Sequence, residues 1–279
     1  MEWKTFWYIL VLGYSPIQIY AQNLVENGDF EIFGKYVPYN HFGNDTVFPK
    51  GWDYGIGFGS PDYYRINNPD RRLSVPINWY GFHPAQTGHA YIGFYPFSRD
   101  GGTEHILGTL KSPLKIHEEY DCKIWLRYAG NCCAYSLDRL EIMFFENPDI
   151  LLKRMDANYR DFADQNDYPQ VVIENRNILS DTAWTCVVEK FIANANYRYF
   201  VIGIFYQHQI HKKLISQINK YRSIRVKESK ENISLKFDNV TTKLLLSPNF
   251  NYKGKCIHKV IEPYYFIDNV SVCLSDSTP

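Results

Sequence analysis

The stretch NLVENGDFEIFG, residues 23–34, decides the fold class of this 279-residue chain. A strand-like start at Leu24 and Val25 runs into Asn-Gly-Asp, residues 27–29, a sequence typical of a tight turn. An aromatic residue and an acid, Phe30 and Glu31, follow at once. The segment therefore combines a strand, a turn and a carboxylate in very few residues. The structural reason for this combination has to come from the remaining sequence.

Residues 1–21 predict a secretory signal peptide. A lysine precedes an apolar stretch from Phe6 to Leu12, and the small residue Ala21 follows. An apolar run of this length is typical of a cleavable leader and is too short to cross a bilayer. The alternative is a buried first strand or helix. We expect cleavage after Ala21, and a secreted, periplasmic or cell-surface protein without a transmembrane segment.

Charge and composition narrow the function classes. Lys plus Arg and Asp plus Glu both number 30, so the net charge is zero. Zero net charge argues against a general nucleic-acid binder, which needs a basic surface. Aromatic residues make up 17% of the chain and favour pleated, half-buried surfaces. Six cysteines in an exported chain predict one or two disulfides and some buried free thiols, in a pairing that the sequence leaves open.

Strand-like runs recur between clusters of Gly, Pro, Asn and Asp. In one of these runs, every second residue, Cys122, Ile124 and Leu126, is apolar and lies on the same face of the predicted strand. This pattern predicts an all-β fold, an antiparallel two-sheet sandwich in a single domain over residues 22–279. The runs are HAYIGFYPF (89–97), EHILGTLKSPL (104–114), YDCKIWLRYAG (120–130), RLEIMFFEN (139–147), WTCVVEKFIAN (184–194), YRYFVIGIFYQ (197–207) and PYYFIDNVSVCL (263–274).

Two segments interrupt the strand pattern. Residues 150–162 predict a short helix. Residues 207–262 predict a long insertion before the last strand, partly helical and basic over residues 207–231. A solvated loop or helix face is the simpler interpretation of this basic segment, and a docking patch for an anionic polymer is the alternative.

The chain resembles the galactose-binding-like jelly rolls used as carbohydrate-binding modules. NLVENGDFE resembles their first strand and YYFIDNVSV their last. More closely, residues 23–274 resemble the jelly-roll module of secreted and outer-membrane Bacteroidota proteins, often followed by an OmpA-like peptidoglycan-binding domain. Two departures are the absence of that second domain and the long, basic segment 208–261. The resemblance implies a jelly roll in which residues 23–34 pair with residues 264–274.

The same resemblance implies a structural calcium ion where the first and last strands meet. Calcium takes about six to eight oxygen ligands, which carboxylates and carbonyl groups supply. The expected ligand positions are Asp29, Glu31, His89 and Asp268, with carbonyl groups of the turn and of the loop around His89. The alternative is that Glu31 and Asp268 hydrogen-bond local backbone groups without a metal.

Aromatic side chains in turn-rich segments are candidate ligand contacts, because sugar rings stack their apolar faces on Trp and Tyr. The segments SPDYYRIN and VPINWYGFHP carry such residues, and we expect both on one rim of the sandwich. Trp52 and Trp184 are predicted to lie in the core. The candidate ligand-binding residues are Tyr63, Tyr64, Arg65, Asn78, Trp79 and Tyr80.

These features predict a secreted, non-catalytic binding module whose partner is a glycan. A cell-envelope assembly protein that binds another protein through the same loops is the alternative, and a glycan hydrolase is a more distant one. The sequence has no GxSxG and no HExxH motif, although its many acids leave a glycosidase pair open. We expect Glu104 to be a structural partner of an arginine such as Arg65 or Arg127.

Overall fold

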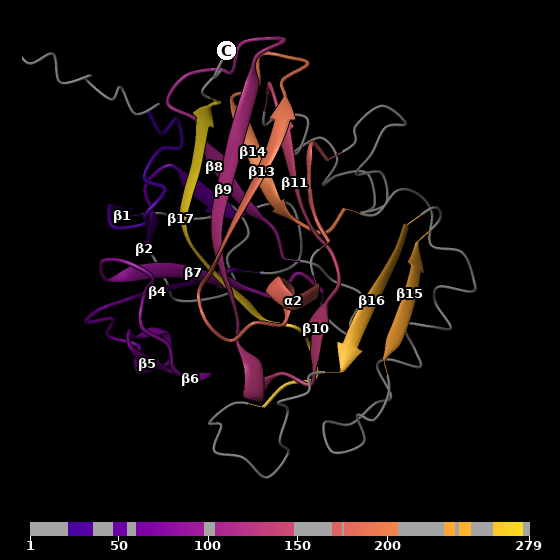
Figure 1. Ribbon diagram of the computed structural model, residues 1–279. Helices are drawn as coiled ribbons and strands as arrows, with labels where there is room; N and C mark the ends of the chain where they lie inside the picture. Colours follow the sequence, from indigo (N-terminus) through magenta and orange to yellow (C-terminus); the bar gives the residue numbers. More distant parts are fainter. Residues whose placement is uncertain are drawn as a thin grey trace, which may run out of the picture.

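A computed structural model describes residues 22–35, 47–54, 60–97, 104–147, 169–174, 176–205, 232–237, 240–246 and 259–275. Nearly all of the secondary-structure elements in these residues are strands, arranged in two five-stranded antiparallel sheets and three smaller ones (Figure 1). The architecture confirms the predicted all-β sandwich. None of the helices formed by these residues is long and apolar enough to span a membrane.

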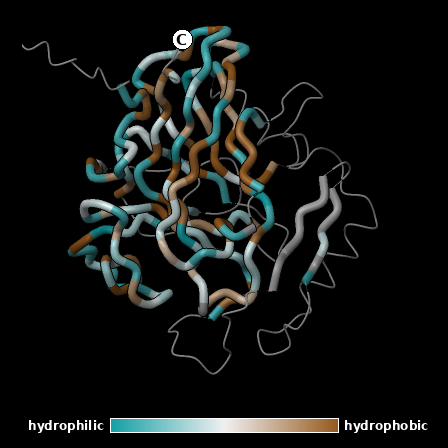
Figure 2. The backbone as a smooth tube through the Cα atoms, viewed as in Figure 1, coloured by the Kyte–Doolittle hydropathy of each residue, from teal (hydrophilic) through white to brown (hydrophobic). Residues whose placement is uncertain are grey.

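Sheet I contains the last strand, β17, at its centre, in the order β13-β9-β17-β7-β4. Along β9 the even-numbered residues are buried and the odd-numbered ones are exposed or half-buried, as expected for a strand with one face on the core. Hydrophobic and hydrophilic residues both occur along the strands of the sandwich (Figure 2), and along β9 they follow this alternation. The strands of sheet I are β4 (Asp62–Arg65), β7 (Ala90–Phe94), β9 (Glu119–Tyr128), β13 (Thr185–Ile192) and β17 (Tyr265–Leu274).

Sheet II lies against the inner face of sheet I, in the order β12-β11-β14-β8-β3. Every residue of β11 is buried, and so are all residues of β14 except Tyr199, so these strands are covered on both faces. The strands of sheet II are β3 (Trp52–Tyr54), β8 (Ile106–Thr109), β11 (Leu140–Phe145), β12 (Val171–Ile173) and β14 (Tyr199–Gly203).

Aromatic side chains fill the core between the two sheets. Phe144 of β11 stacks on Phe191 of β13 with ring centroids 4.5 Å apart. Trp52 meets Phe200 edge to face within sheet II and is 4% exposed, which confirms it as a core residue. Burying one such side chain stabilises the fold by about 1.5–3 kcal/mol. Trp184, also predicted to be core, is half-buried and packs against the same cluster.

Smaller elements surround the sandwich. The insertion predicted over residues 207–262 contributes two strands, which extend β10 into a three-stranded sheet beside the sandwich (Figure 1). The predicted helix over residues 150–162 lies outside the described residues. The remaining elements are β1 (Phe33–Lys35), β2 (Val47–Pro49), η1 (Arg71–Leu73), β5 (Ile77–Asn78), β6 (Gly81–Phe82), η2 (Gly130–Cys132), β10 (Tyr135–Leu137), α2 (Arg176–Leu179), β15 (Ile233–Phe237) and β16 (Val240–Leu246).

The N-terminal segment, residues 23–30, bridges the two sheets through β17 and the end of β8. The Leu24 N–H donates to the Val272 carbonyl of β17 in sheet I at 2.9 Å. The Leu24 carbonyl accepts from the Lys111 N–H, just past β8 of sheet II, at 2.7 Å. The first and last segments thus lie together as predicted, but residues 23–30 form no ladder with β17, and β1 pairs with β2 instead.

The Asn-Gly-Asp turn, residues 27–29, explains why a strand start, a turn and an acid follow one another so closely in residues 23–34. The Val270 N–H donates to the Gly28 carbonyl at 2.8 Å. A Cβ on Gly28 would lie 2.0 Å from the Val270 carbonyl oxygen, so only glycine allows this backbone approach. The Asn27 side chain bonds the Ile32 backbone, and the Asn27 carbonyl accepts the indole N–H of Trp52 at 2.9 Å. The turn therefore anchors the first segment to β17 and to the core.

Candidate functional site

Four of the six predicted ligand-binding residues lie in the core. The Tyr63 hydroxyl donates to the Phe30 carbonyl at 2.8 Å, and the Tyr64 hydroxyl bonds that of Tyr264 at 2.9 Å. Tyr80 stacks on Tyr264 with ring centroids 4.1 Å apart. The exposed fractions of these buried side chains are 5% for Tyr63, 1% for Tyr64, 4% for Tyr80 and 1% for Asn78.

The reason is that residues 75–86 fold back over the outer face of sheet I rather than forming an open rim. The Asn78 side-chain amide donates to the Tyr91 hydroxyl of β7 at 2.8 Å, and the His83 ring lies 4.7 Å from the Phe266 ring of β17. A side chain that is packed and hydrogen-bonded in this way presents no face to a sugar. The accessible surface therefore offers no ligand contact from Tyr63, Tyr64, Tyr80 or Asn78.

Arg65 and Trp79 are the two predicted residues that reach the surface. The Arg65 guanidinium lies 4.9 Å from the ring centroid of Phe33, and that of Arg72 lies 4.9 Å from the ring centroid of Trp79. Trp79 is 36% exposed and sits at the tip of the β5–β6 hairpin. These two residues belong to separate cation–π pairs and do not form one platform.

The described residues form a groove of about 760 Å³ between the N-terminal segment and sheet I. Its floor is the outer face of β9 and β17, and residues 23–32 with the loop at residues 86–87 form its walls. The lining is polar apart from one tryptophan and a few aliphatic side chains. The lining residues are Asn23, Val25, Glu26, Asn27, Gly28, Asp29, Ile32, Lys50, Gln86, Thr87, Lys111, Lys123, Trp125, Asn269, Val270, Ser271 and Cys273.

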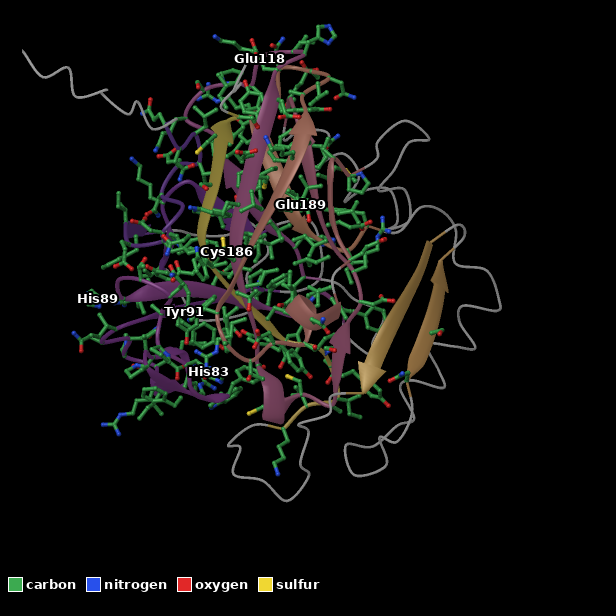
Figure 3. The ribbon with its side chains drawn as sticks, in the orientation of Figure 1. His83, His89, Tyr91, Glu118, Cys186 and Glu189 are labelled. Atoms are coloured by element: carbon green, nitrogen blue, oxygen red, sulfur yellow. The ribbon has the colours of Figure 1, made fainter. Side chains whose placement is uncertain are left out.

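Trp125 is the single aromatic residue of this lining. The alternation of β9 turns Lys123, Trp125 and Arg127 outward, and Trp125 lies opposite Cys186 of β13. Figure 3 shows Cys186 in the middle of this face, above Tyr91 and His83. The Trp125 ring is half-buried, and its indole N–H donates to no residue in the described part of the chain. The groove thus offers an apolar ring face and an open hydrogen-bond donor together.

Polar groups beside Trp125 are open as well. Ser271 lies directly opposite Lys123 in the register of β17 and β9. Within the described ranges neither the Lys123 amine nor the Ser271 hydroxyl has a hydrogen-bond partner. The amide of Asn269, in contrast, bonds the side chains of Gln86 and Thr87 and fixes the wall of the groove. A rigid wall with free donors on the floor suits a ligand rich in hydroxyl groups.

Glu31 and Asp268 lie close enough to interact electrostatically, and both accept backbone N–H groups. Glu31 Oε1 accepts from His89 at 2.7 Å and from Ala90 at 3.0 Å. A Cβ on Gly88, where φ is +62°, would lie 2.3 Å from Glu31 Oε1, so the loop needs glycine to approach this closely. Asp268 Oδ2 accepts from the N–H groups of residues 86 and 87, and its Oδ1 accepts from that of residue 269.

These contacts leave few oxygens for calcium. Three of the four carboxylate oxygens of Glu31 and Asp268 already accept N–H groups. Asp29 and His89 are exposed, and no group of three or more acidic, His or Cys side chains with metal-binding geometry occurs among the described residues. The geometry fits local hydrogen bonding better than a calcium shell of about six to eight oxygens. Calcium at this position stays a prediction.

Burial changes the protonation of two acids, Asp268 and Glu104. It raises the pKa of Asp268 to about 7, and the charge of Glu31 adds to this effect. It also raises the pKa of Glu104 to about 8, with a further contribution from Asp62. Glu104 accepts the N–H groups of Ser60 at 3.1 Å and of Tyr95 at 2.8 Å, and among the described residues it forms an ion pair with neither Arg65 nor Arg127.

The described cysteines include buried free thiols, as predicted. Cys122 and Cys133 are both buried and free, and burial raises the pKa of Cys122 to about 12. Cys186 is a free, exposed thiol on the outer face of sheet I. Cys256 lies outside the described residues, and the disulfides stay a prediction.

Comparison with known proteins does not identify a family. No family model and no curated protein matches the chain. Similar solved structures include tailspike protein 4 of bacteriophage CBA120, in its enzymatically active domain, at 10% identity and a TM-score of 0.36 over 91% of this chain. The CBM22-1–GH10 modules of Clostridium thermocellum endo-1,4-beta-D-xylanase 10B, complexed with xylohexaose, give 8% identity and a TM-score of 0.35 over 82% of this chain.

A cleaved adhesin domain of Lys-gingipain from Porphyromonas gingivalis is similar at 9% identity and a TM-score of 0.34, over 82% of this chain and 93% of that one. This chain spans only 21% of the tailspike structure and 27% of the xylanase structure. Such low TM-scores assign neither a family nor a ligand. The resemblance to the module of OmpA-type proteins stays a prediction.

Proposed function

We propose that the chain is a glycan-binding module whose site is the groove beside Trp125. The observation that carries this proposal is a half-buried tryptophan with an open indole N–H on the floor of a polar groove. Sugar rings have apolar C–H faces that pack on an indole ring and hydroxyl groups that exchange hydrogen bonds. The open amine of Lys123 and hydroxyl of Ser271 lie on the same floor and supply such bonds.

Trp125 and a second tryptophan outside the groove, Trp79, make the proposal testable. Trp125→Ala should lower affinity for a glycan selected on an array by about tenfold or more, equivalent to about 1.4 kcal/mol. Trp79→Ala is the matched control, because Trp79 is surface-exposed on the β5–β6 hairpin and does not line the groove. Calorimetric titration measures both. Loss of binding in Trp79→Ala with unchanged binding in Trp125→Ala would place the site on the hairpin and refute the groove.

A second candidate is a protein-binding role within the cell envelope. The observation that favours it is the apolar tip of the β5–β6 hairpin, where Ile77 is 61% and Phe82 is 65% exposed, next to Trp79. Contiguous exposed apolar side chains mark interaction surfaces. This role would be favoured if the protein bound no glycan on a broad array. It would also require a protein partner that the wild type captures and that the double variant Ile77→Ser plus Phe82→Ser does not.

The proposed ligand agrees with export of the chain. Environmental and cell-surface polysaccharides are met outside the cytoplasm, and residues 1–21 predict a signal peptide. We therefore propose a secreted, periplasmic or cell-surface location. Fractionation of the producing cells, with antibody detection of the mature chain, tests this location directly.

A further inference from the structure

The outer face of sheet I continues beyond the groove, from β9 onto the edge strand β13. Within the described structure, β13 is the outermost strand of sheet I and pairs with β9 alone. The Cys186 and Val188 side chains of β13 are exposed on this face, and Val188 is 52% exposed. Neither side chain lines the groove, so together they form additional accessible surface beside it.

The strand register makes this surface continuous with the groove floor. Cys186 lies directly opposite Trp125, and Val188 lies directly opposite Lys123. On the other side of β9, Lys123 lies opposite Ser271. Residues directly opposite one another in antiparallel strands have Cβ atoms about 4.5–5.5 Å apart, so one ligand can contact both. Among the described residues, the groove floor therefore extends across β9 onto β13.

The segment of residues 75–86 covers one end of this strip. The indole N–H of Trp184, immediately before β13, donates to the Pro84 carbonyl at 2.8 Å. Arg127, the next outward residue of β9 after Trp125, is half-buried at this end, and its Nε is a buried donor without a partner among the described residues. The covering segment therefore prevents a ligand on Trp125 from extending in this direction along the strands.

Charged side chains that pair with one another occupy the opposite end of the strip. The Lys190 amine of β13 lies 3.0 Å from a carboxylate oxygen of Glu119 and 3.2 Å from one of Asp121, both on β9. The Ser275 hydroxyl donates to Asp121 at 2.8 Å. Because these groups already satisfy one another, they offer a ligand less than the open amine of Lys123 does. The accessible surface with open groups thus crosses the strands rather than following them.

We infer that the groove binds a chain of linked sugars, and that Cys186 and Val188 form a second sugar subsite on β13 beside the one at Trp125. Neighbouring strands lie about 4.7–4.9 Å apart, so the floor from β17 across β9 to β13 spans about 10 Å, which is longer than a single sugar ring. The thiol and the isopropyl group present apolar surface to the C–H face of a second sugar. An edge strand also presents unpaired backbone N–H and C=O groups, to which sugar hydroxyls can bond. This inference rests on the proposed glycan-binding function and names its ligand class, a linear oligosaccharide.

The dependence of affinity on chain length is the first test. An array selects the glycan, and calorimetry measures a length series of it from one sugar upward. Affinity should rise as the chain grows to fill both subsites. Val188→Ser should lower the affinity for the longer chains by about fourfold, as expected for the loss of roughly one methylene of apolar contact, and should leave the shortest bound member unchanged. Ile192→Ser is the matched control and should leave all affinities unchanged, because Ile192 is 61% exposed on the same face of β13 but lies opposite Glu119, beyond the ion pairs.

Alkylation of Cys186 locates the second sugar directly. Cys186 is an exposed free thiol, whereas the free thiols of Cys122 and Cys133 are buried. Peptide mass spectrometry after iodoacetamide treatment follows the reaction of Cys186 separately from that of every other cysteine. The rate should fall in proportion to the fraction of protein bound to the longer chains and should change little with the shortest bound member. The thiol introduced by Ile192→Cys, at the far end of the strip, is the control and should react at an unchanged rate.

The outcomes separate this inference from the proposed function. Equal affinity for all chain lengths, or unchanged alkylation of Cys186 at saturating oligosaccharide, would overturn the second subsite and leave the groove proposal standing. Equal protection of the thiol introduced by Ile192→Cys would also overturn the subsite, because the effect would not be local. Absence of any bound glycan, or full binding in Trp125→Ala, would overturn the proposed function and this inference with it.

Discussion

Asp268 should make the protein less stable as the pH rises toward neutrality. Its side chain is 0% exposed and accepts three backbone N–H groups at the point where β17 changes register. Burial raises its pKa from 3.8 to about 7. A carboxyl group with a higher pKa in the folded chain binds its proton preferentially there. Its stabilising contribution is complete below about pH 4 and is lost as the pH rises to 7.

The size of this effect follows from the difference between the two pKa values. At about 1.36 kcal/mol for each pH unit, a rise from 3.8 to about 7 corresponds to about 4 kcal/mol of unfolding free energy. For a domain of this size, this would lower the melting temperature by about 8–16 °C between pH 4 and pH 7.5. Water penetration around the buried carboxylate would reduce the effect.

Comparison of the wild type with Asp268→Asn isolates this group from the other carboxylates. The asparagine keeps the shape and an acceptor oxygen but cannot titrate, so its advantage over the wild type should grow with pH. Urea unfolding followed by tryptophan fluorescence from pH 4 to pH 7.5 measures the difference. Asp29→Asn, an exposed acid in the nearby turn, should follow the wild type. A constant difference between Asp268→Asn and the wild type over this range would refute the reasoning.

Four other outcomes are expected. If calcium binds at Asp268, it should stabilise the fold by about 2.7 kcal/mol at a hundredfold excess over its dissociation constant. The stabilisation should be larger at pH 7.5 than at pH 5, where the carboxyl group holds its proton. Equal melting temperatures in calcium and in chelator would contradict calcium binding. Arg127→Met should raise the melting temperature by about 2–4 °C, because an unpartnered buried donor disappears; a lower melting temperature contradicts this. Gly28→Ala should destabilise the fold by about 1–3 kcal/mol in urea, since its methyl group would clash with a carbonyl oxygen 2.0 Å away; unchanged stability would show that the backbones can separate. N-terminal sequencing of exported protein should begin at Gln22, and an intact Met1 would contradict cleavage.

The strands were predictable because their signal is local. The seven runs between residues 89 and 274 each contain a strand of the sandwich, and the alternation of Cys122, Ile124 and Leu126 gives the buried face of β9. The same alternation places Trp125 and Arg127 on the opposite face. This signal was available, but the sequence does not show that the opposite face lines a groove.

The groove and the covering hairpin depend on contacts between residues far apart in the chain. Turn-rich composition predicts that residues 75–86 leave the sheet, but not that they fold back onto it, and this return buries Tyr80 and Asn78. The groove wall depends on the register shift in β17 between Asp268 and Ser271. Such a shift arises from tertiary packing and leaves no clear local sequence signal.

The position of β17 has a consequence for the order of assembly. This strand follows all the others in the sequence, yet it lies between β9 and β7 at the centre of sheet I. Until it docks, β9 and β7 lack their shared partner and residues 23–28 lack half of their backbone contacts. Closing such long chain loops is entropically costly and slows folding. A chain made from its N-terminus would leave sheet I open, with β9 and β7 as unpaired edges, until β17 completed both the sheet and the groove.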